Sequence, residues 1–191
     1  MANKDAPFGL RPIGKVGQNR DAQGLSEYSI AASTAVIYHN DPVAIDSNGE
    51  LVQGTAGAGN DLLGSLNGVF YTDASTSKPT WANHLAASNT ATDIVGFVSD
   101  DPYERFEVQS NNTGASAQTD IGNVANIEYT AGSAPNYVSK VELDDSDLAT
   151  SDGQLKVIGV SKDPDNNDLT SANVNWVVTI NEHFLKQEAG I

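Results

Sequence analysis

The chain has 191 residues, and its 25 acidic and 10 basic side chains give a formal net charge of −15. It has no cysteine, which excludes disulfides and thiolate metal sites, and its negative charge disfavours direct binding to nucleic acid phosphates. Only 18% of the residues are charged, and abundant small polar residues favour β-structure with many turns over a helical bundle.

The first twenty residues differ from the rest in charge. They carry four basic residues against the single Asp5, a net charge of +3, whereas the other 171 residues carry 6 basic and 24 acidic residues, a net charge of −18. Prolines and glycines exclude one regular helix here, yet apolar residues recur at Phe8, Leu10, Ile13 and Val16. We therefore predict an extended N-terminal arm over residues 1–21 and a single β-rich body over residues 22–191.

Two placements of this arm are open. It either folds back on its own body or docks on another protein chain, and its charge and its Gly and Pro content favour the second. In that interpretation, strand addition to a partner sheet satisfies the backbone donors of the arm, Phe8 fills an apolar pocket and Arg11 meets a carboxylate. The predicted interface residues are Pro7, Phe8, Leu10, Arg11, Pro12 and Ile13.

The body consists of short predicted strands separated by turn signals, a pattern typical of a β-sandwich or β-barrel. Asn48-Gly49 predicts a hairpin turn, and glycines 64 and 68 predict a bulged or bent strand. We expect an all-β, mainly antiparallel fold with at most one or two short helices. The predicted strands cover residues 27–32, 35–39, 43–45, 50–53, 62–71, 94–98, 103–108, 126–130, 138–143, 155–160 and 174–180.

Two segments allow more than one interpretation. Residues 72–92 break the strand pattern, and Pro79 precedes a possible short helix over residues 80–87, for which helix and irregular structure are equally open. Residues 95–102 resemble residues 158–164, since each is an apolar strand followed by an Asp-Pro turn. Chance similarity of two hairpins is favoured over a duplicated unit.

The polar clusters do not indicate a catalytic or metal site. Residues 163–168 place oxygen ligands at alternate positions, but Asp168 and Val174 stand where a calcium loop needs Gly and Glu. No nucleophile elbow, phosphate loop or dinucleotide fingerprint occurs. The three histidines lie far apart, without the spacing of metal ligands: His39, His84 and His183. We expect no enzyme, no catalytic or metal residues and no cofactor.

Several short motifs resemble one family. Ala6-Pro-Phe-Gly-Leu-Arg-Pro12 is similar to the opening of small structural proteins encoded beside the capsid genes of tailed bacteriophages. Residues 156–160, 164–166 and 179–183 are similar to the C-terminal end of the same group, and residues 106–109 are compatible with it. The resemblance implies a virion protein, a head decoration or cement protein that is β-rich and trimeric on the capsid exterior. It brings no catalytic residues.

On this hypothesis the partners are the major capsid protein and further copies of the chain as a homotrimer, with no direct nucleic acid and no membrane contact. No stretch has the roughly 18 apolar residues that span a bilayer, and because the N-terminal residues lack an apolar h-region we expect no secretory signal. The expected location is the outer surface of the virion capsid, after assembly in the host cytoplasm. Two rival interpretations stay open: a tail or head–tail connector component, and a β-domain that binds calcium or carbohydrate.

Overall fold

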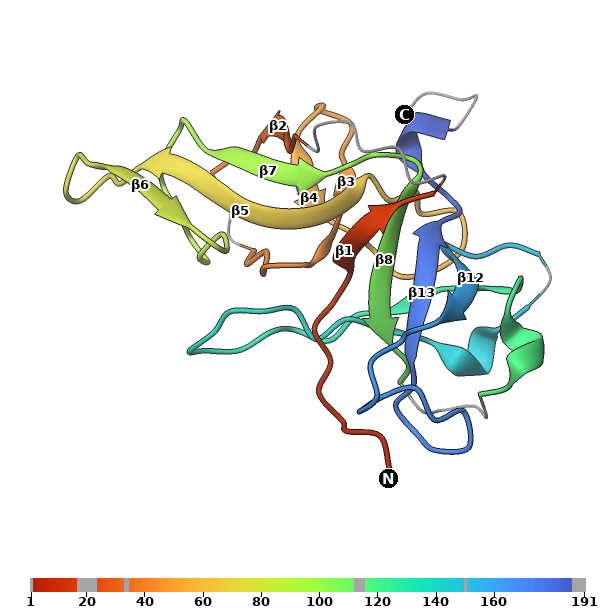
Figure 1. Cartoon of the computed structure of the whole chain (residues 1–191). Helices are drawn as coiled ribbons and strands as arrows, with labels where there is room; N and C mark the ends of the chain where they lie inside the picture. Colours follow the sequence, from red (N-terminus) through yellow and green to blue (C-terminus); the bar gives the residue numbers. More distant parts are fainter. Residues whose placement is uncertain (1, 17–23, 33–34, 112–115, 150, 187–191) are drawn as a thin grey trace.

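The structure is a computed structural model of the chain, and it describes residues 2–16, 24–32, 35–111, 116–149 and 151–186. A five-stranded sheet, a six-stranded sheet and a two-stranded ribbon make up the fold, with antiparallel neighbours throughout (Figure 1). Within these ranges, helical structure is limited to three 3₁₀ turns: η1 (Gln118–Asp120), η2 (Asp145–Asp147) and η3 (Phe184–Lys186). The predicted all-β fold is therefore confirmed. None of the described helices has the length and apolar character needed to cross a membrane.

The five-stranded sheet and the ribbon share one hydrophobic core. In spatial order the sheet contains β1 (Arg11–Lys15), β8 (Glu104–Gln109), β13 (Asn175–Ile180), β12 (Leu155–Val160) and β9 (Val124–Ala125). The ribbon pairs β10 (Ile127–Glu128) with β11 (Glu142–Leu143). Alternate residues of the central strands point inward, so Phe106, Trp176 and Val178 are buried with Ile127 and Leu143 in one cluster.

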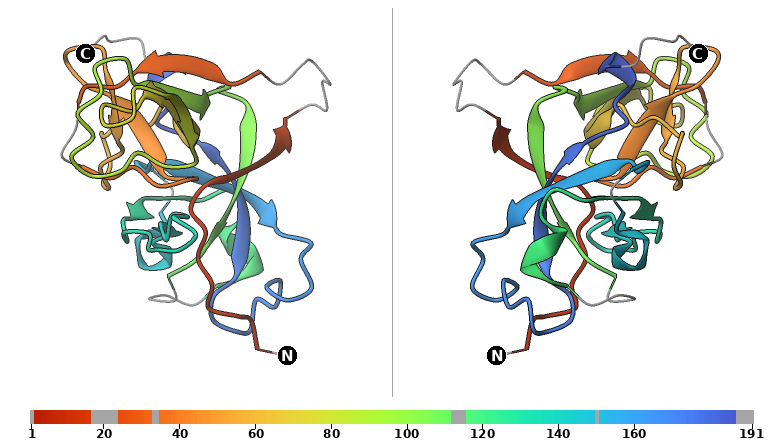
Figure 2. Two further views of the ribbon diagram at one scale, coloured as in Figure 1. Left: turned by 90° about the vertical axis from the view of Figure 1, so that its left-hand side faces the viewer. Right: turned by 90° about the vertical axis from the view of Figure 1, so that its right-hand side faces the viewer.

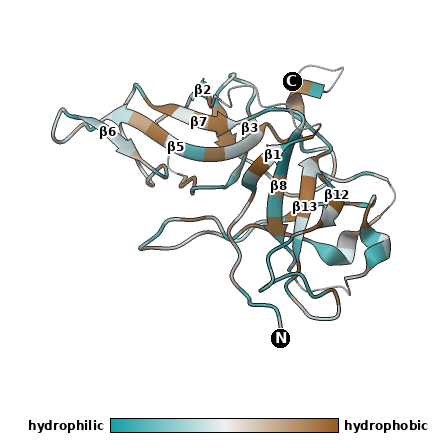
Figure 3. Cartoon of the chain, in the orientation of Figure 1, coloured by the Kyte–Doolittle hydropathy of each residue, from teal (hydrophilic) through white to brown (hydrophobic). Residues whose placement is uncertain are grey.

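The six-stranded sheet encloses a second core. In spatial order it contains β2 (Ser26–Ser29), β7 (Val95–Ser99), β5 (Gly64–Thr72), β3 (Pro42–Ile45) and β4 (Leu51–Gln53), and β6 (Pro79–Ala82) pairs with the far half of β5. The β5–β6 hairpin projects away from the rest of the molecule (Figure 1). Leu66, Val69 and Val98 fill this core, and Figure 3 shows hydrophobic residues concentrated on the strands rather than the loops.

The two cores are joined by residues that pass between them. Leu62 belongs to the core of the five-stranded sheet, whereas the next residue, Leu63, belongs to the core of the six-stranded sheet. Residues 100–103 connect β7 directly to β8 and so link the sheets a second time.

Local sequence signals predicted several elements correctly. The Asn48-Gly49 turn closes the β3–β4 hairpin, with Gly49 at φ +79° and Ile45 opposite Leu51. The register of β5 shifts between Leu66 and Gly68, as expected for a bulged strand. The possible helix over residues 80–87 is wrong, because residues 79–82 form β6 and pair with β5 instead.

Candidate functional site

The N-terminal segment, defined here as residues 2–16, lies along its own five-stranded sheet (Figure 2). At its start, the side-chain amide of Asn3 donates to the carbonyl of Asp168 at 2.9 Å, and the ammonium of Lys4 pairs with Asp165. The carbonyl of Lys4 accepts a bond of 2.7 Å from the side chain of Asn166. These contacts hold the segment against the loop between β12 and β13.

A buried glutamine on β8 holds the next part of the segment. The Gln109 side chain is 1% exposed; its carbonyl accepts from the amide of Ala6 at 2.8 Å, and its Nε2 donates to the carbonyl of Lys4 at 3.0 Å. The same Nε2 donates to Oδ1 of Asn175 on β13, also at 3.0 Å. One side chain therefore supplies the segment with the backbone partners that a sheet neighbour would otherwise provide.

Gly9 and Leu10 cross between the two sheets. The amide of Leu10 donates to the carbonyl of Asn40 at 2.9 Å, and its carbonyl accepts from the hydroxyl of Ser65 at 2.6 Å. Gly9 has a φ of +75°, and a Cβ there would lie 2.3 Å from the Asn40 carbonyl oxygen and 2.5 Å from Cβ of Ser139. Only glycine suits this crossing, because the backbone conformation and the available space both exclude a side chain.

Residues 11–15 then form β1 at the edge of the five-stranded sheet. Pro12 lies opposite Phe106, and the register shifts between Pro12 and Gly14. The guanidinium of Arg11 pairs with Glu107 and also lies over the Phe8 ring, with 4.4 Å between Cζ and the ring centroid. The ammonium of Lys15 pairs with Asp101 at 2.5 Å. Within the described ranges, all the ion pairs join this basic segment to the acidic body.

These contacts correct the expected destination of the arm. The backbone donors of Ala6, Leu10 and Val16 bond to the same chain, so the expectation that another chain satisfies them is wrong. The opposite charge that favoured a foreign partner is matched within the molecule. The alternative interpretation, in which the arm folds back on its own body, is the one that the structure shows.

The six predicted interface residues differ in their burial and in their contacts. Leu10 is fully buried in the core, and it is therefore unavailable to a partner. Arg11 is engaged by Glu107, Ile13 is 48% exposed, and the remaining residues, Pro7, Phe8 and Pro12, are half-buried. Residues 2–16 form part of the body rather than a separate arm, and residues 17–21 of the predicted arm lie outside the described residues.

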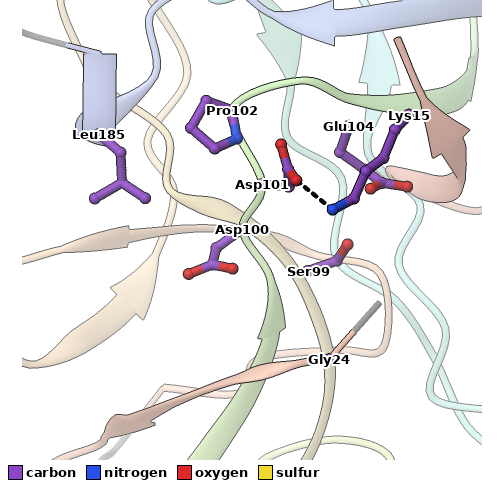
Figure 4. A pocket seen from close by; sticks show the side chains of 8 residues that line it. All are labelled: Lys15, Gly24, Ser99, Asp100, Asp101, Pro102, Glu104 and Leu185. Carbon is purple, nitrogen blue, oxygen red and sulfur yellow. Dashed lines mark ion pairs between the residues drawn. The ribbon is translucent and has the colours of Figure 1, made fainter. Parts of the chain in front are cut away.

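A cavity of about 240 Å³ lies beside the end of β1, and Figure 4 shows the side chains around it. Its lining residues come from β1, the segment before β2, the end of β7 and the start of β8 with their connection, and the C-terminal turn: Lys15, Gly24, Ser99, Asp100, Asp101, Pro102, Glu104 and Leu185. The hydrogen bond from Lys15 is the main cause that lowers the pKa of Asp101, whereas burial raises the pKa of Glu104. The carboxylate of Asp100 accepts from the hydroxyls of Ser26 and Tyr28 at 2.9 and 2.6 Å.

The carboxylates around this cavity are held by other groups of the described chain. His183 nearby is 1% exposed, with its Nδ1 accepting from the amide of Leu185 at 3.1 Å. Burial lowers the pKa of His183 to about 4, so its imidazole is neutral at neutral pH. Among the residues that the structure describes, no three His, Cys, Asp or Glu side chains are placed to hold a metal ion.

No local pattern in the sequence predicted the buried polar residues that hold the N-terminal segment. Gln109, Asn166 and Asn175 are each at most 5% exposed, although such residues are usually found at the surface. Their role depends on contacts across more than sixty residues of chain, which a local pattern does not encode. The chain matches no family model, no curated protein and no solved structure.

Proposed function

We propose that this chain is a decoration, or cement, protein of a tailed bacteriophage head, which binds the outer capsid surface and stabilises the lattice. Its partners on this proposal are the major capsid protein and further copies of the chain, arranged as a homotrimer. The proposal takes its specific content from the resemblance of several short motifs to that family. The arrangement of these motifs in the fold supports it.

The family-like motifs are neighbours in space. Residues 6–12 lead into β1, residues 106–109 lie in β8, residues 179–183 begin in β13, and residues 156–160 lie in β12. These four strands are consecutive neighbours in the five-stranded sheet. The similarity therefore concerns one contiguous structural unit rather than scattered matches, and this observation carries the proposal.

The register and the loops strengthen this point. Phe106 on β8 lies opposite Pro12 on one side and, on the other, Val178, the residue just before the 179–183 motif. Thr179 of that motif lies opposite Lys156 on β12. Residues 164–166 form the remaining motif, which binds the N-terminal segment through the Lys4 pair with Asp165 and the bond from Asn166 to the Lys4 carbonyl.

The composition of the site also favours a structural role. Among the described residues, the carboxylates that line the cavity are bonded within the chain: Asp101 pairs with Lys15, and Asp100 accepts from Ser26. A small domain that repeats on a lattice binds more strongly through multivalency, because many weak contacts act together. Such a function requires a stable body and an accessible surface, and it requires no catalytic group.

Quantitative mass spectrometry of purified phage particles tests the proposal. A decoration protein occurs in hundreds of copies, in a fixed ratio to the major capsid protein. A few copies per particle would place the chain in the tail or connector instead, and its absence from particles would overturn a virion role. A melting temperature that rises by many degrees with calcium, and falls with chelator, would favour the calcium-binding alternative.

A further inference from the structure

The outward side of the six-stranded sheet carries a cluster of three aromatic side chains, of which two are exposed and Phe97 is half-buried. Phe70 on β5 and Trp81 on β6 lie directly opposite each other and are 42% and 52% exposed. The ring of Phe97 on β7 lies beside Trp81, with ring centroids 5.0 Å apart and planes tilted by 56°. We call Phe70, Trp81 and Phe97 the aromatic face. It lies on the part of the sheet that includes the projecting hairpin (Figure 1).

The fold holds this face in place without using it as core. Gly68 lies opposite Phe97, and a Cβ at Gly68 would come within 2.5 Å of Cζ2 of Trp81, so the indole lies directly over the glycine. The inward residues of the same strands, such as Leu66 and Val98, already fill the core. A preformed aromatic surface loses little conformational freedom when a partner binds it.

The chain covers other aromatic rings with its own cations. The Lys186 ammonium lies 4.9 Å from the centroid of the exposed Tyr103 ring, and the Arg11 guanidinium lies over Phe8. Within the described part of the chain, no cation lies in this way over Phe70 or Trp81. The exposed parts of the Phe70 and Trp81 rings are accessible to an arginine or lysine from a partner. Trp is the ring that attracts cations most strongly.

Acidic residues flank the aromatic face. Glu27 on β2 is exposed and lies directly opposite Phe97 in the register. Asp93 is also exposed, and its carboxylate accepts from the amide of Thr72 at 3.0 Å, just beyond Phe70 on β5. The chain has a net charge of −15, and if two copies met through their aromatic faces, the acidic residues of one copy would lie against those of the other. The complementary partner is therefore a basic surface.

We infer that the aromatic face is the surface that docks on the capsid lattice, and that the lattice presents arginine or lysine side chains to Trp81 and Phe70. This inference rests on the proposed function. The aromatic face then makes the contact with the capsid that the sequence analysis assigned to the N-terminal segment, because that segment is part of the chain's own fold.

Binding to phage heads prepared without this protein tests the inference, with co-sedimentation measured over a series of protein concentrations. We expect Phe70→Ser and Trp81→Ser each to weaken binding at least tenfold, because buried aromatic anchors concentrate binding energy. Tyr103→Ser is the matched control, since it removes a more exposed ring elsewhere and should bind like the wild type. Unchanged binding of both aromatic-face variants would overturn the inference.

A charge reversal separates the basic partner from other occupants. Glu27→Lys should weaken binding to heads at low salt, and the loss should shrink as salt screens the charges. Equal or tighter binding of this variant would contradict the basic partner. Phe70→Ser remains informative if Trp81→Ser lowers the melting temperature. If the variants without heads sediment at a lower oligomeric state than the wild type, the aromatic face binds other copies of the chain, and the inference is overturned. If the wild-type protein fails to bind heads, the proposed function itself is overturned.

Discussion

The amide of Leu10 donates to the carbonyl of Asn40, and this bond of 2.9 Å ties the five-stranded sheet to the six-stranded one. Asn40 in turn donates from its amide to Leu66 on β5, while the Leu10 side chain is buried among residues of the other core. The N-terminal segment therefore links the five-stranded sheet and its core to the six-stranded sheet.

Truncating Leu10 should destabilise the whole protein. Leu10 is fully buried, so Leu10→Ala leaves a cavity and should lower the free energy of unfolding by about 2–5 kcal/mol. Urea denaturation measures this change. Ile13→Ala, three residues later and 48% exposed, is the control and should change stability by no more than about 0.5 kcal/mol. Similar effects of the two variants would show that Leu10 is not a core residue.

Two glycines with similar backbone angles separate steric fit from conformational strain. Gly9 and Gly49 have φ values of +75° and +79°, but a Cβ at Gly9 would meet Asn40 at 2.3 Å and one at Gly49 would meet nothing within 4 Å. Gly49→Ala should cost about 1 kcal/mol of stability through strain, and Gly9→Ala should cost clearly more. Equal losses in thermal or urea unfolding would contradict the tight crossing at Gly9.

Removing the buried amide of Gln109 should loosen the start of the N-terminal segment. Gln109→Ala removes the partner of the Ala6 amide and of the buried Asn175 side chain, whereas the Lys4 carbonyl keeps its bond from Asn166. A buried polar group left unsatisfied costs about 1–3 kcal/mol. Hydrogen exchange at Ala6 should accelerate in the variant. Gln118→Ala, at an exposed position, should leave both stability and exchange at Ala6 unchanged.

The β10–β11 ribbon should make stability depend on pH. Glu142 lies opposite Glu128, and burial, followed by repulsion from Asp5, Glu128 and Asp145, raises the pKa of Glu142 from 4.5 to about 7. Between these values the folded state holds more protons at Glu142 than the unfolded state. The contribution of Glu142 to stability is therefore complete below about pH 4.5 and is lost as pH rises toward 7.

Glu142→Gln isolates that contribution. The variant cannot ionise at this position, so its stability relative to the wild type should increase as pH rises from 4.5 to 7. Urea denaturation of both proteins across this range measures the difference. A difference that stays constant with pH, or that decreases, would mean that ionisation of Glu142 does not destabilise the folded protein.

Short-range signals in the sequence predicted much of the sheet structure. The Asn48-Gly49 hairpin and the strand at residues 155–160 were found because turn chemistry and apolar runs are local. The possible helix near Trp81 was wrong because cross-strand pairing with Phe70 decides the conformation there. Residues 35–39 form isolated bridges at Ile37 and His39 rather than a full strand.

The position of the N-terminal segment was harder to predict. Its basic charge was taken to favour a foreign partner, but the same charge also complements the acidic body of its own chain. Three-dimensional matches decide between them, such as the pairing of Lys15 with Asp101 and the enclosure of Leu10. The aromatic face also depends on three-dimensional pairing, because the register places Phe70 opposite Trp81 and leaves both side chains exposed.

Imaging of the phage particle by electron cryo-microscopy tests the proposed role most directly. We predict density for this fold repeated over the outer head surface, with Phe70 and Trp81 against the lattice and residues 2–16 within their own body. Density confined to the tail or connector would contradict the decoration role. Residues 2–16 extended across a neighbouring subunit would contradict the structural account of the N-terminal segment.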